Sequence, residues 1–421
     1  MNPFKEKPMK LEDTLMDWKQ IYPAPYDKYT VDPYTRTRVI LMNGTEFEAN
    51  WFSHQFARHE VNGDVRRELA MLRRGEQQQQ KLLSALKPLN ETTLEHTIGY
   101  EQLAVDLTAM LAKREPNGVV KTALDFALLE DFDHLYRYAD LLEMETGLYA
   151  ENLVGGYTEI MPGRPTIAEH RCPYDGIFPY IDAKKDALET KLCVNIITAA
   201  EQQTMNYYMN LSAAYTTDLG RQLYQEIGMI EEQHVTQYGQ LMDPRETWLE
   251  CLLMHQYTEC FLYWSCAGTE TDPRFKKIWE MLLEQEIAHL HKAADMLQRL
   301  ENKSWEEVIP GGSFPAPLEL TSNIDYVRGV LASSVENTAV RERIVNASEL
   351  GPDSDFRRYQ EMVNRDAQAV PSHMVIDRYI ARAGRDYRFE TQPNPIEALR
   401  DRRTDNTSVG RACVPEMTGS R

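Results

Sequence analysis

Apolar residues recur every three or four positions along most of this chain, which is the spacing of amphipathic helices. Between Glu91 and about Leu300 the pattern is interrupted by a long segment at 145–185 and by the short polar breakers EPNG, TTDLG, DPRE and AGTETDP. These interruptions divide the region into six predicted helices. We therefore expect an all-α fold built on a bundle of long helices.

The N-terminal region departs from this pattern at residues 37–49. There TRVILM and TEFEA flank an Asn-Gly dipeptide typical of a two-residue turn, so the sequence predicts a small N-terminal β-hairpin. Residues 51–86 have a helical and very polar pattern. Their glutamine run, 77–80, is expected on a solvated helix face.

Changes of composition divide the chain into four regions. The six helices are followed by PGGSFPAP and by weaker helical stretches interrupted at Pro371, and the last residues are polar and rich in breakers. We expect an N-terminal hairpin with a helical extension at 1–90, a helical bundle at 91–300, a C-terminal helical extension at 301–402 and a flexible tail at 403–421.

Acidic residues and histidines lie within the apolar stripes of the six helices in a repeating pattern. A shift of 100 residues superposes the first two helices on the third and fourth without a gap, and the fifth and sixth form a looser third copy. Each copy has one carboxylate and, 27 to 30 residues later, a carboxylate and a histidine three residues apart. The copies are Glu101, Asp131 and His134; Glu201, Glu231 and His234; and Glu259, Glu286 and His289.

A carboxylate at a core position needs a partner that compensates its charge. A buried carboxylate without a partner is costly or takes up a proton, and lysine and arginine are scarce on these stripes. One Glu-x-x-His pair is usually a salt bridge, but three copies in register favour a shared metal ion. On the second helix Glu130, Asp133, Arg137 and Asp140 lie opposite the stripe and are expected in water.

This set of residues resembles the ferritin-like dimetal-carboxylate superfamily, whose members use a Glu from each of two helices and a Glu-x-x-His from each of two others. EQQTMNYY, which starts at Glu201, is similar to the first ligand helix of rubrerythrin. The helix spacing is similar to that of bacterial multicomponent monooxygenase hydroxylases and of the ribonucleotide reductase small subunit. Asp131 departs from the usual Glu, and the chain has no four-cysteine rubredoxin domain.

The resemblance spans about 200 residues and implies a ferritin-like four-helix bundle that holds two Fe ions, with Mn also suitable. It implies a diiron-carboxylate oxidoreductase, an oxygenase, oxidase or peroxidase, that activates O2 or peroxide against a small-molecule substrate. An oxygenase would also need an electron donor. The alternatives are a non-enzymatic ferritin-like iron-handling protein and a helical scaffold with a degenerate metal site.

Two pairings of the copies remain open. The superfamily needs a long crossover between its second and third ligand helices, and 145–185 supplies one between copies one and two. The sequence Asp-Pro-Arg-Glu at 243–246 predicts a tight turn between copies two and three instead. However, Glu259, Glu286 and His289 keep the full family pattern and favour copies two and three. We expect copies one and two to form the bundle, with the fifth and sixth helices alongside.

Charge and composition narrow the range of partners. The net charge of −19 argues against nucleic-acid binding, and 42% hydrophobic with 26% charged residues is typical of soluble globular proteins. No apolar run approaches the ~20 residues of a membrane span. The N-terminus has no apolar signal core, and the six cysteines form no CxxC. We expect a cytoplasmic protein without membrane partners, in a form compatible with a homo-oligomer.

Overall fold

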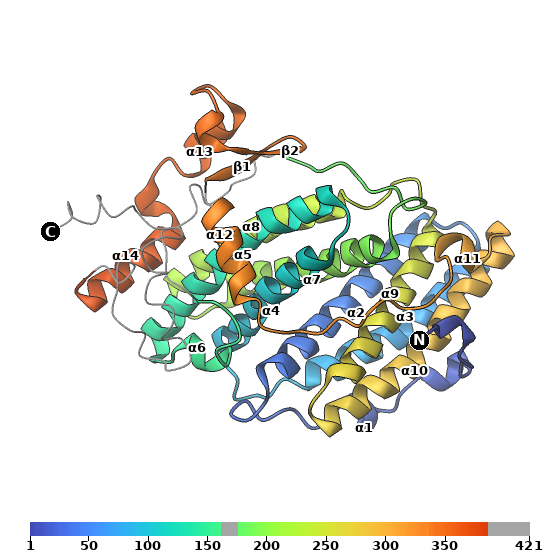
Figure 1. The fold of residues 1–421 in the computed structure, drawn as a ribbon. Helices are drawn as coiled ribbons and strands as arrows, with labels where there is room; N and C mark the ends of the chain where they lie inside the picture. The colour runs from blue at the N-terminus through green and yellow to red at the C-terminus, as the bar shows by residue number, and fades with distance from the viewer. Residues whose placement is uncertain (161–175, 335, 386–421) are drawn as a thin grey trace. The chain divides into compact units, whose positions relative to one another are not determined.

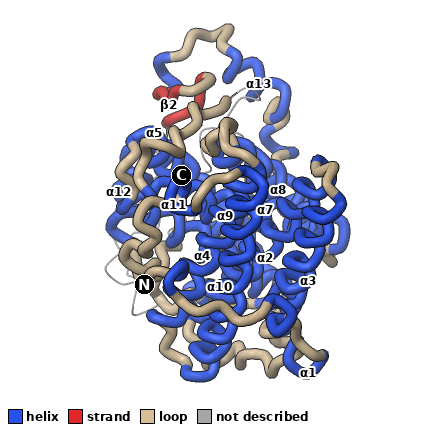
Figure 2. The backbone as a smooth tube through the Cα atoms, turned by 90° about the vertical axis from the view of Figure 1, so that its right-hand side faces the viewer, coloured by secondary structure: helices blue, strands red, loops and turns tan. Residues whose placement is uncertain are grey.

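The computed structural model describes residues 1–160, 176–334 and 336–385. Long helices make up most of this described chain, and its only strands form one short antiparallel pair (Figure 1; Figure 2). The prediction of an all-α fold with a small β-hairpin is therefore confirmed. Across these same ranges, the helices are all too short or too polar to cross a membrane. The predicted tail at 403–421 lies outside the described residues.

The chain folds into two compact units, each assembled from separate stretches of sequence. Unit 1 comprises Met1–Glu91, Tyr180–Gln203 and Met242–Leu320, and unit 2 comprises Thr92–Pro179, Thr204–Leu241 and Thr321–Arg421. The N-terminal helices therefore belong to the same unit as the fifth and sixth predicted helices. This division cuts across the regions 1–90 and 91–300 expected from composition.

Unit 1 is built on four long helices. These are α2 (Pro33–His59), α3 (Gly63–Ala85), α9 (Trp248–Thr269) and α10 (Pro273–Glu301), accompanied by the first part of α7 (Leu188–Ala214). The short elements of this unit are η1 (Pro3–Lys5), η2 (Leu11–Thr14), α1 (Trp18–Ile21) and α11 (Trp305–Val308). Helix α2 packs along α3 and α9 along α10, and the two pairs meet where α2 contacts α9 and α3 contacts α10 (Figure 1).

Capping residues explain where these helices begin. Asp32 accepts a hydrogen bond at the start of α2 and is followed by a proline, and Thr247 and Glu250 form a capping box at the start of α9. Asp243 accepts a hydrogen bond from the backbone N–H of Arg245 at 3.0 Å, within the turn that precedes α9. The tight turn predicted at 243–246 is therefore present.

The predicted N-terminal hairpin is wrong, because residues 37–49 lie inside α2. Residues 39–42 are all buried. Four consecutive buried residues cover every face of a helix, so other elements surround α2 at this point. Gly44 approaches α7 so closely that a Cβ would lie 2.1 Å from Oε1 of Gln203. The glycine therefore permits a close helix contact, and tertiary packing overrides the turn preference of Asn-Gly.

Unit 2 is built on α4 (Thr93–Arg114), α5 (Gly118–Thr146), the second part of α7 and α8 (Asp218–Gly239). Its other elements are α6 (Ala150–Leu153), α12 (Ile324–Ser334), β1 (Asn337–Val340), β2 (Arg343–Asn346), η3 (Ala347–Glu349), α13 (Asp355–Val363), η4 (Ala367–Ala369) and α14 (Pro371–Ala383). Helix α4 packs along α5, and α5 contacts α8. The hairpin of β1 and β2 packs near α13, far along the chain from its expected place (Figure 1).

The charged face of α5 is buried, although the sequence pattern places it in water. Helices α12 and α14 both pack against α5. Arg137 is only 1% exposed, pairs with Asp133 at 3.2 Å and donates a hydrogen bond to Ser372 of α14. The C-terminal helix α14 therefore supplies a polar partner, Ser372, for this buried face.

Candidate metal centres

The first copy of the repeat and the second half of the second copy meet inside unit 2. Glu101 lies on α4, Asp131 and His134 lie on α5, and Glu231 and His234 lie on α8. All five side chains have 0% relative exposure. Ligand atoms of Glu101, His134 and Glu231 lie within 4.8 Å of one another. Three helices therefore bring these predicted site residues to one buried point.

Glu231 stands between the two histidines of this cluster. Its Oε1 is 3.0 Å from Nδ1 of His134, and its Oε2 is 3.2 Å from Nδ1 of His234. Nδ1 of His234 also lies 3.4 Å from Oδ1 of Asp131. The cluster thus has two halves, each with one imidazole that turns Nδ1 toward carboxylate oxygens, and Glu231 belongs to both.

Glu201 lies on α7, the helix that continues from unit 1 into unit 2. Its side chain is 2% exposed. All six residues of copies one and two are therefore buried, and their role as metal ligands stays a prediction.

Hydrogen bonds orient the carboxylates of the cluster. The Tyr208 hydroxyl donates to Oε1 of Glu101 at 2.5 Å, and Thr108 donates to Oδ2 of Asp131 at 3.2 Å. Each of these bonds occupies one oxygen of the carboxylate. The other oxygens, Oε2 of Glu101 and Oδ1 of Asp131, accept no hydrogen bond from the described residues. Buried acceptors of this kind are rare unless another partner satisfies them.

Glu130 also contributes to the cluster, although the sequence pattern placed it in water. It is 1% exposed, and its Oε2 lies 3.0 Å from Nε2 of His234. A histidine that donates its Nε2–H to a carboxylate has the lone pair on Nδ1. The position of Glu130 therefore fits an imidazole prepared to bind an ion through Nδ1. Only the packing of α8 against α5 reveals this contact.

Burial dominates the electrostatics of the cluster. It raises the pKa of Asp131 to about 7 and, together with the charge of Glu231, the pKa of Glu101 well above its usual range. Burial opposes the charge of Glu231, but the two histidines hold its pKa below the ordinary value. Burial likewise lowers the pKa of His134, whereas the surrounding carboxylates overcome burial and raise that of His234. Protons compensate the buried charges when no metal ion does.

The third copy of the repeat forms a separate cluster in unit 1. Glu259 lies on α9, and Glu286 and His289 lie on α10. They meet two residues that the sequence analysis missed, Glu46 on α2 and Glu76 on α3. Ligand atoms of Glu76, Glu286 and His289 lie within 4.8 Å of one another, as do those of Glu46, Glu76 and Glu259.

The sequence contains a signal for these missed residues. Glu46 and Glu76 are 30 residues apart, the interval found in copies one and two, and Gln79 stands where a histidine is expected. The predicted hairpin hid Glu46, and the glutamine run hid Gln79. Gln79 has 0% exposure, so the prediction of a solvated face is wrong at this residue. A fourth copy, with Gln in place of His, therefore accompanies the third.

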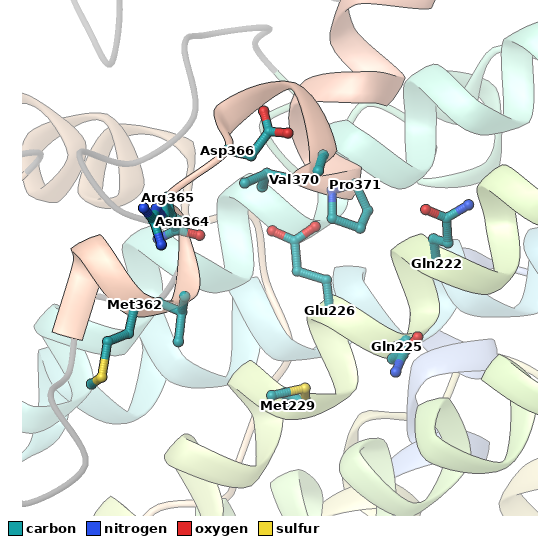
Figure 3. Close-up of a pocket in the computed structure, with 12 residues that line it drawn as sticks. Gln222, Gln225, Glu226, Met229, Met362, Asn364, Arg365, Asp366, Val370 and Pro371 are labelled. Atoms are coloured by element: carbon teal, nitrogen blue, oxygen red, sulfur yellow. The ribbon is translucent and has the colours of Figure 1, made fainter.

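A pocket of about 540 Å³ lies between α8 and residues 362–371 (Figure 3). Gln222 and Met229 line it from α8. Because successive residues of an α-helix are about 100° apart, both lie on roughly the opposite side of α8 from Glu231. The pocket therefore faces away from the carboxylate cluster.

Comparison with known proteins gives no relative. No protein-family model, no curated protein and no solved structure matches this chain. Its function therefore has to be inferred from the buried clusters themselves.

Proposed function

We propose that this protein is a ferritin-like dimetal-carboxylate oxidoreductase whose centre lies in unit 2. One Fe or Mn ion is held by Glu101, His134 and Glu231, and a second by Asp131, Glu201, Glu231 and His234. The centre activates O2 or peroxide against a small substrate. The proposal is supported by the order of carboxylates and Glu-x-x-His pairs along the helices, which is similar to the ligand pattern of dimetal-carboxylate bundles, with Asp131 in place of one Glu.

The observation that carries the proposal is the position of Glu231. Each of its two oxygens faces Nδ1 of a different histidine, at 3.0 Å for His134 and 3.2 Å for His234. A salt bridge would need only one of these imidazoles. A carboxylate that faces both imidazoles could serve as a ligand in each half of the cluster.

The charge and the donor atoms of the cluster fit such a pair of ions. Its four carboxylates, Glu101, Asp131, Glu201 and Glu231, match the charge of two divalent cations. Oxygen-rich sites with few imidazoles suit Fe and Mn. The buried oxygens of Glu101 and Asp131 that accept no hydrogen bond are available as ligands.

The protein's own residues orient the ligands and exclude water. Tyr208 and Thr108 each hold one oxygen of a cluster carboxylate and leave the other toward the centre. Glu130 accepts the outer N–H of His234 and thereby fixes its tautomer and ring orientation. Fe or Mn ions bound by these residues would supply redox chemistry toward O2 or peroxide, with the electrons coming from a reductant.

The experiment is anaerobic loading of the full chain with Fe(II), followed by exposure to O2 with a chemical reductant in excess. An oxidoreductase consumes O2 repeatedly while its metal content stays constant. An iron-handling protein instead takes up iron far beyond the number of its ligand sets and stops when Fe(II) is exhausted. A degenerate scaffold retains no metal after removal of unbound iron.

Glu231→Ala and Glu232→Ala form a matched pair for this test. Both remove a carboxylate from α8, but Glu232 is exposed and lies outside the cluster. We expect Glu231→Ala to lose O2 consumption and the metal of the unit 2 centre, and Glu232→Ala to keep both. Equal metal content and O2 consumption in the two folded variants would refute the proposal.

A further inference from the structure

The cluster in unit 1 corresponds residue by residue to the cluster in unit 2. Its members, in the order of α2, α3, α9 and α10, are Glu46, Glu76 with Gln79, Glu259, and Glu286 with His289. The counterparts in the order of α4, α5, α7 and α8 are Glu101, Asp131 with His134, Glu201, and Glu231 with His234.

The internal contacts of the two clusters correspond as well. Nδ1 of His289 lies 3.0 Å from Glu286 and 3.3 Å from Glu76. In unit 2, Nδ1 of His234 lies 3.2 Å from Glu231 and 3.4 Å from Asp131. The Tyr263 hydroxyl donates to Glu46 at 2.5 Å, and the Tyr208 hydroxyl donates to Glu101 in the same way in unit 2. The imidazole and its carboxylates therefore have the same arrangement in both units.

Buried carboxylate oxygens in unit 1 also remain without hydrogen-bond donors. Within the described chain, Oε2 of Glu46, Glu76 and Glu286 and Oε1 of Glu259 accept no hydrogen bond, and these side chains are at most 2% exposed. The one cationic side chain that pairs with them in this part of the structure is His289. Four carboxylates and one imidazole buried together need additional positive charge.

The two clusters differ at Gln79. Its Nε2 donates to Oε1 of Glu286 at 2.7 Å and to Gln285 at 3.1 Å. In unit 2 the matching atom is Nδ1 of His134, which faces Glu231 at 3.0 Å. An amide nitrogen is a hydrogen-bond donor without a lone pair for a metal ion. The half of the unit 1 cluster that contains Gln79 therefore lacks an imidazole. Oε1 of Glu286 already accepts a hydrogen bond from the Gln79 amide in that half.

We infer that unit 1 contains a second metal site, which binds a single divalent transition-metal ion, Fe²⁺ or Mn²⁺, through Glu76, Glu286 and Nδ1 of His289. Mixed imidazole and carboxylate ligands suit these ions. The inference goes beyond the proposed oxidoreductase and does not depend on it, because none of these residues belongs to the unit 2 centre.

The surroundings of His289 indicate that its ion is bound more weakly than the ion held by His234 in unit 2. Nε2 of His289 has no hydrogen-bond partner among the described residues, whereas Nε2 of His234 faces Glu130. Loss of such a partner typically reduces metal affinity by about 10- to 100-fold. The site at His234 should therefore fill before the site in unit 1 as metal is added.

The test uses the full chain with Glu231→Ala and His234→Ala, named here the unit 2-disabled background. Anaerobic equilibrium dialysis against Mn(II) alone, followed by elemental analysis, counts the ions bound to folded protein. We expect about one ion per chain in this background, and none after addition of His289→Gln. His291→Gln is the matched control, because His291 lies on the same helix and bonds to the Pro3 carbonyl at 3.1 Å, outside the cluster.

Gln79→His supplies a gain-of-function arm. It returns an imidazole to the half that lacks one and should raise the count in the background from about one ion to about two. Folded unit 2-disabled protein that binds no Mn(II), or full binding in the His289→Gln variant, would overturn the inference. An unchanged count after Gln79→His would overturn the explanation that the missing imidazole limits unit 1 to a single ion.

Two further measurements keep the inference testable and separate from the proposed function. If the unit 2-disabled background does not fold, His289→Gln alone in the natural chain should remove about one of about three ions. If the natural chain and the folded background bind the same number of ions, the centre proposed in unit 2 fails while the site in unit 1 stands.

Discussion

Gly75→Ala should weaken metal binding in unit 1 by changing the position of one imidazole. Gly75 lies on α3 against the ring of His289. A Cβ at this residue would lie 2.7 Å from Nε2 and 2.8 Å from Cε1 of that ring. Ordinary contacts begin at 3.4 Å, so the ring must retreat by at least 0.7 Å, the difference between 3.4 and 2.7 Å.

The size of this displacement sets the expected loss of metal affinity. Distances between metal ions and their ligands are restricted to about ±0.2 Å, so the retreat exceeds what a bound ion tolerates. We expect a loss of affinity of at least 10-fold, about 1.4 kcal/mol. The helix itself gains about 0.5–1 kcal/mol from Gly→Ala, while overpacking costs about 1–3 kcal/mol, so the protein should remain folded.

The assay is competition between the protein and a fluorescent chelator for Mn(II), in the unit 2-disabled background. Gly268→Ala on α9 is the control, because its Cβ would have nothing within 4 Å. Gly268→Ala should leave the affinity unchanged. Equal affinities for Gly75→Ala and Gly268→Ala, with both variants folded, would show that the position of His289 does not determine metal binding.

Three further predictions follow from the structure. Glu130→Gln should reduce metal affinity in unit 2 by about 10- to 100-fold by removing the charge that orients His234, whereas Glu232→Gln should not; equal chelator competition by both would contradict this. Glu48 lies 2.7 Å from Nε2 of His255 and outweighs burial, so the pKa of His255 is raised above 6.5. The ion pair between Glu48 and His255 therefore contributes its full stabilisation below pH 6.5, and this contribution is lost as pH rises through the raised pKa of His255. Denaturant titrations of metal-free protein should show a free energy of unfolding that falls over this pH range, and His255→Gln should reduce that fall. Metal at 100 times its Kd should increase the free energy of unfolding by about 2.7 kcal/mol per site, and an unchanged thermal midpoint after chelation would contradict metal binding to the native state.

The sequence alone determined most of the helices and three of the four copies of the repeated carboxylate pattern. Helix periodicity and capping depend on residues within a few positions of each other, so both are readable locally. The repeat placed Glu231 and His234 on one face of a helix, and the structure buries both in a carboxylate cluster. Spacing alone sufficed for this because i and i+3 are neighbours on any helix.

Only the tertiary structure decided which copies meet and which polar faces are buried. The interval from Glu46 to Glu76 was visible in the sequence, but the Asn-Gly turn signal concealed it until packing fixed residues 37–49 as helix. Glu130 has the position of a solvated residue on its own helix and is buried because α8 brings His234 to it. Periodicity describes the faces of one helix, whereas burial depends on every element that packs against it, and those elements come from distant parts of the chain.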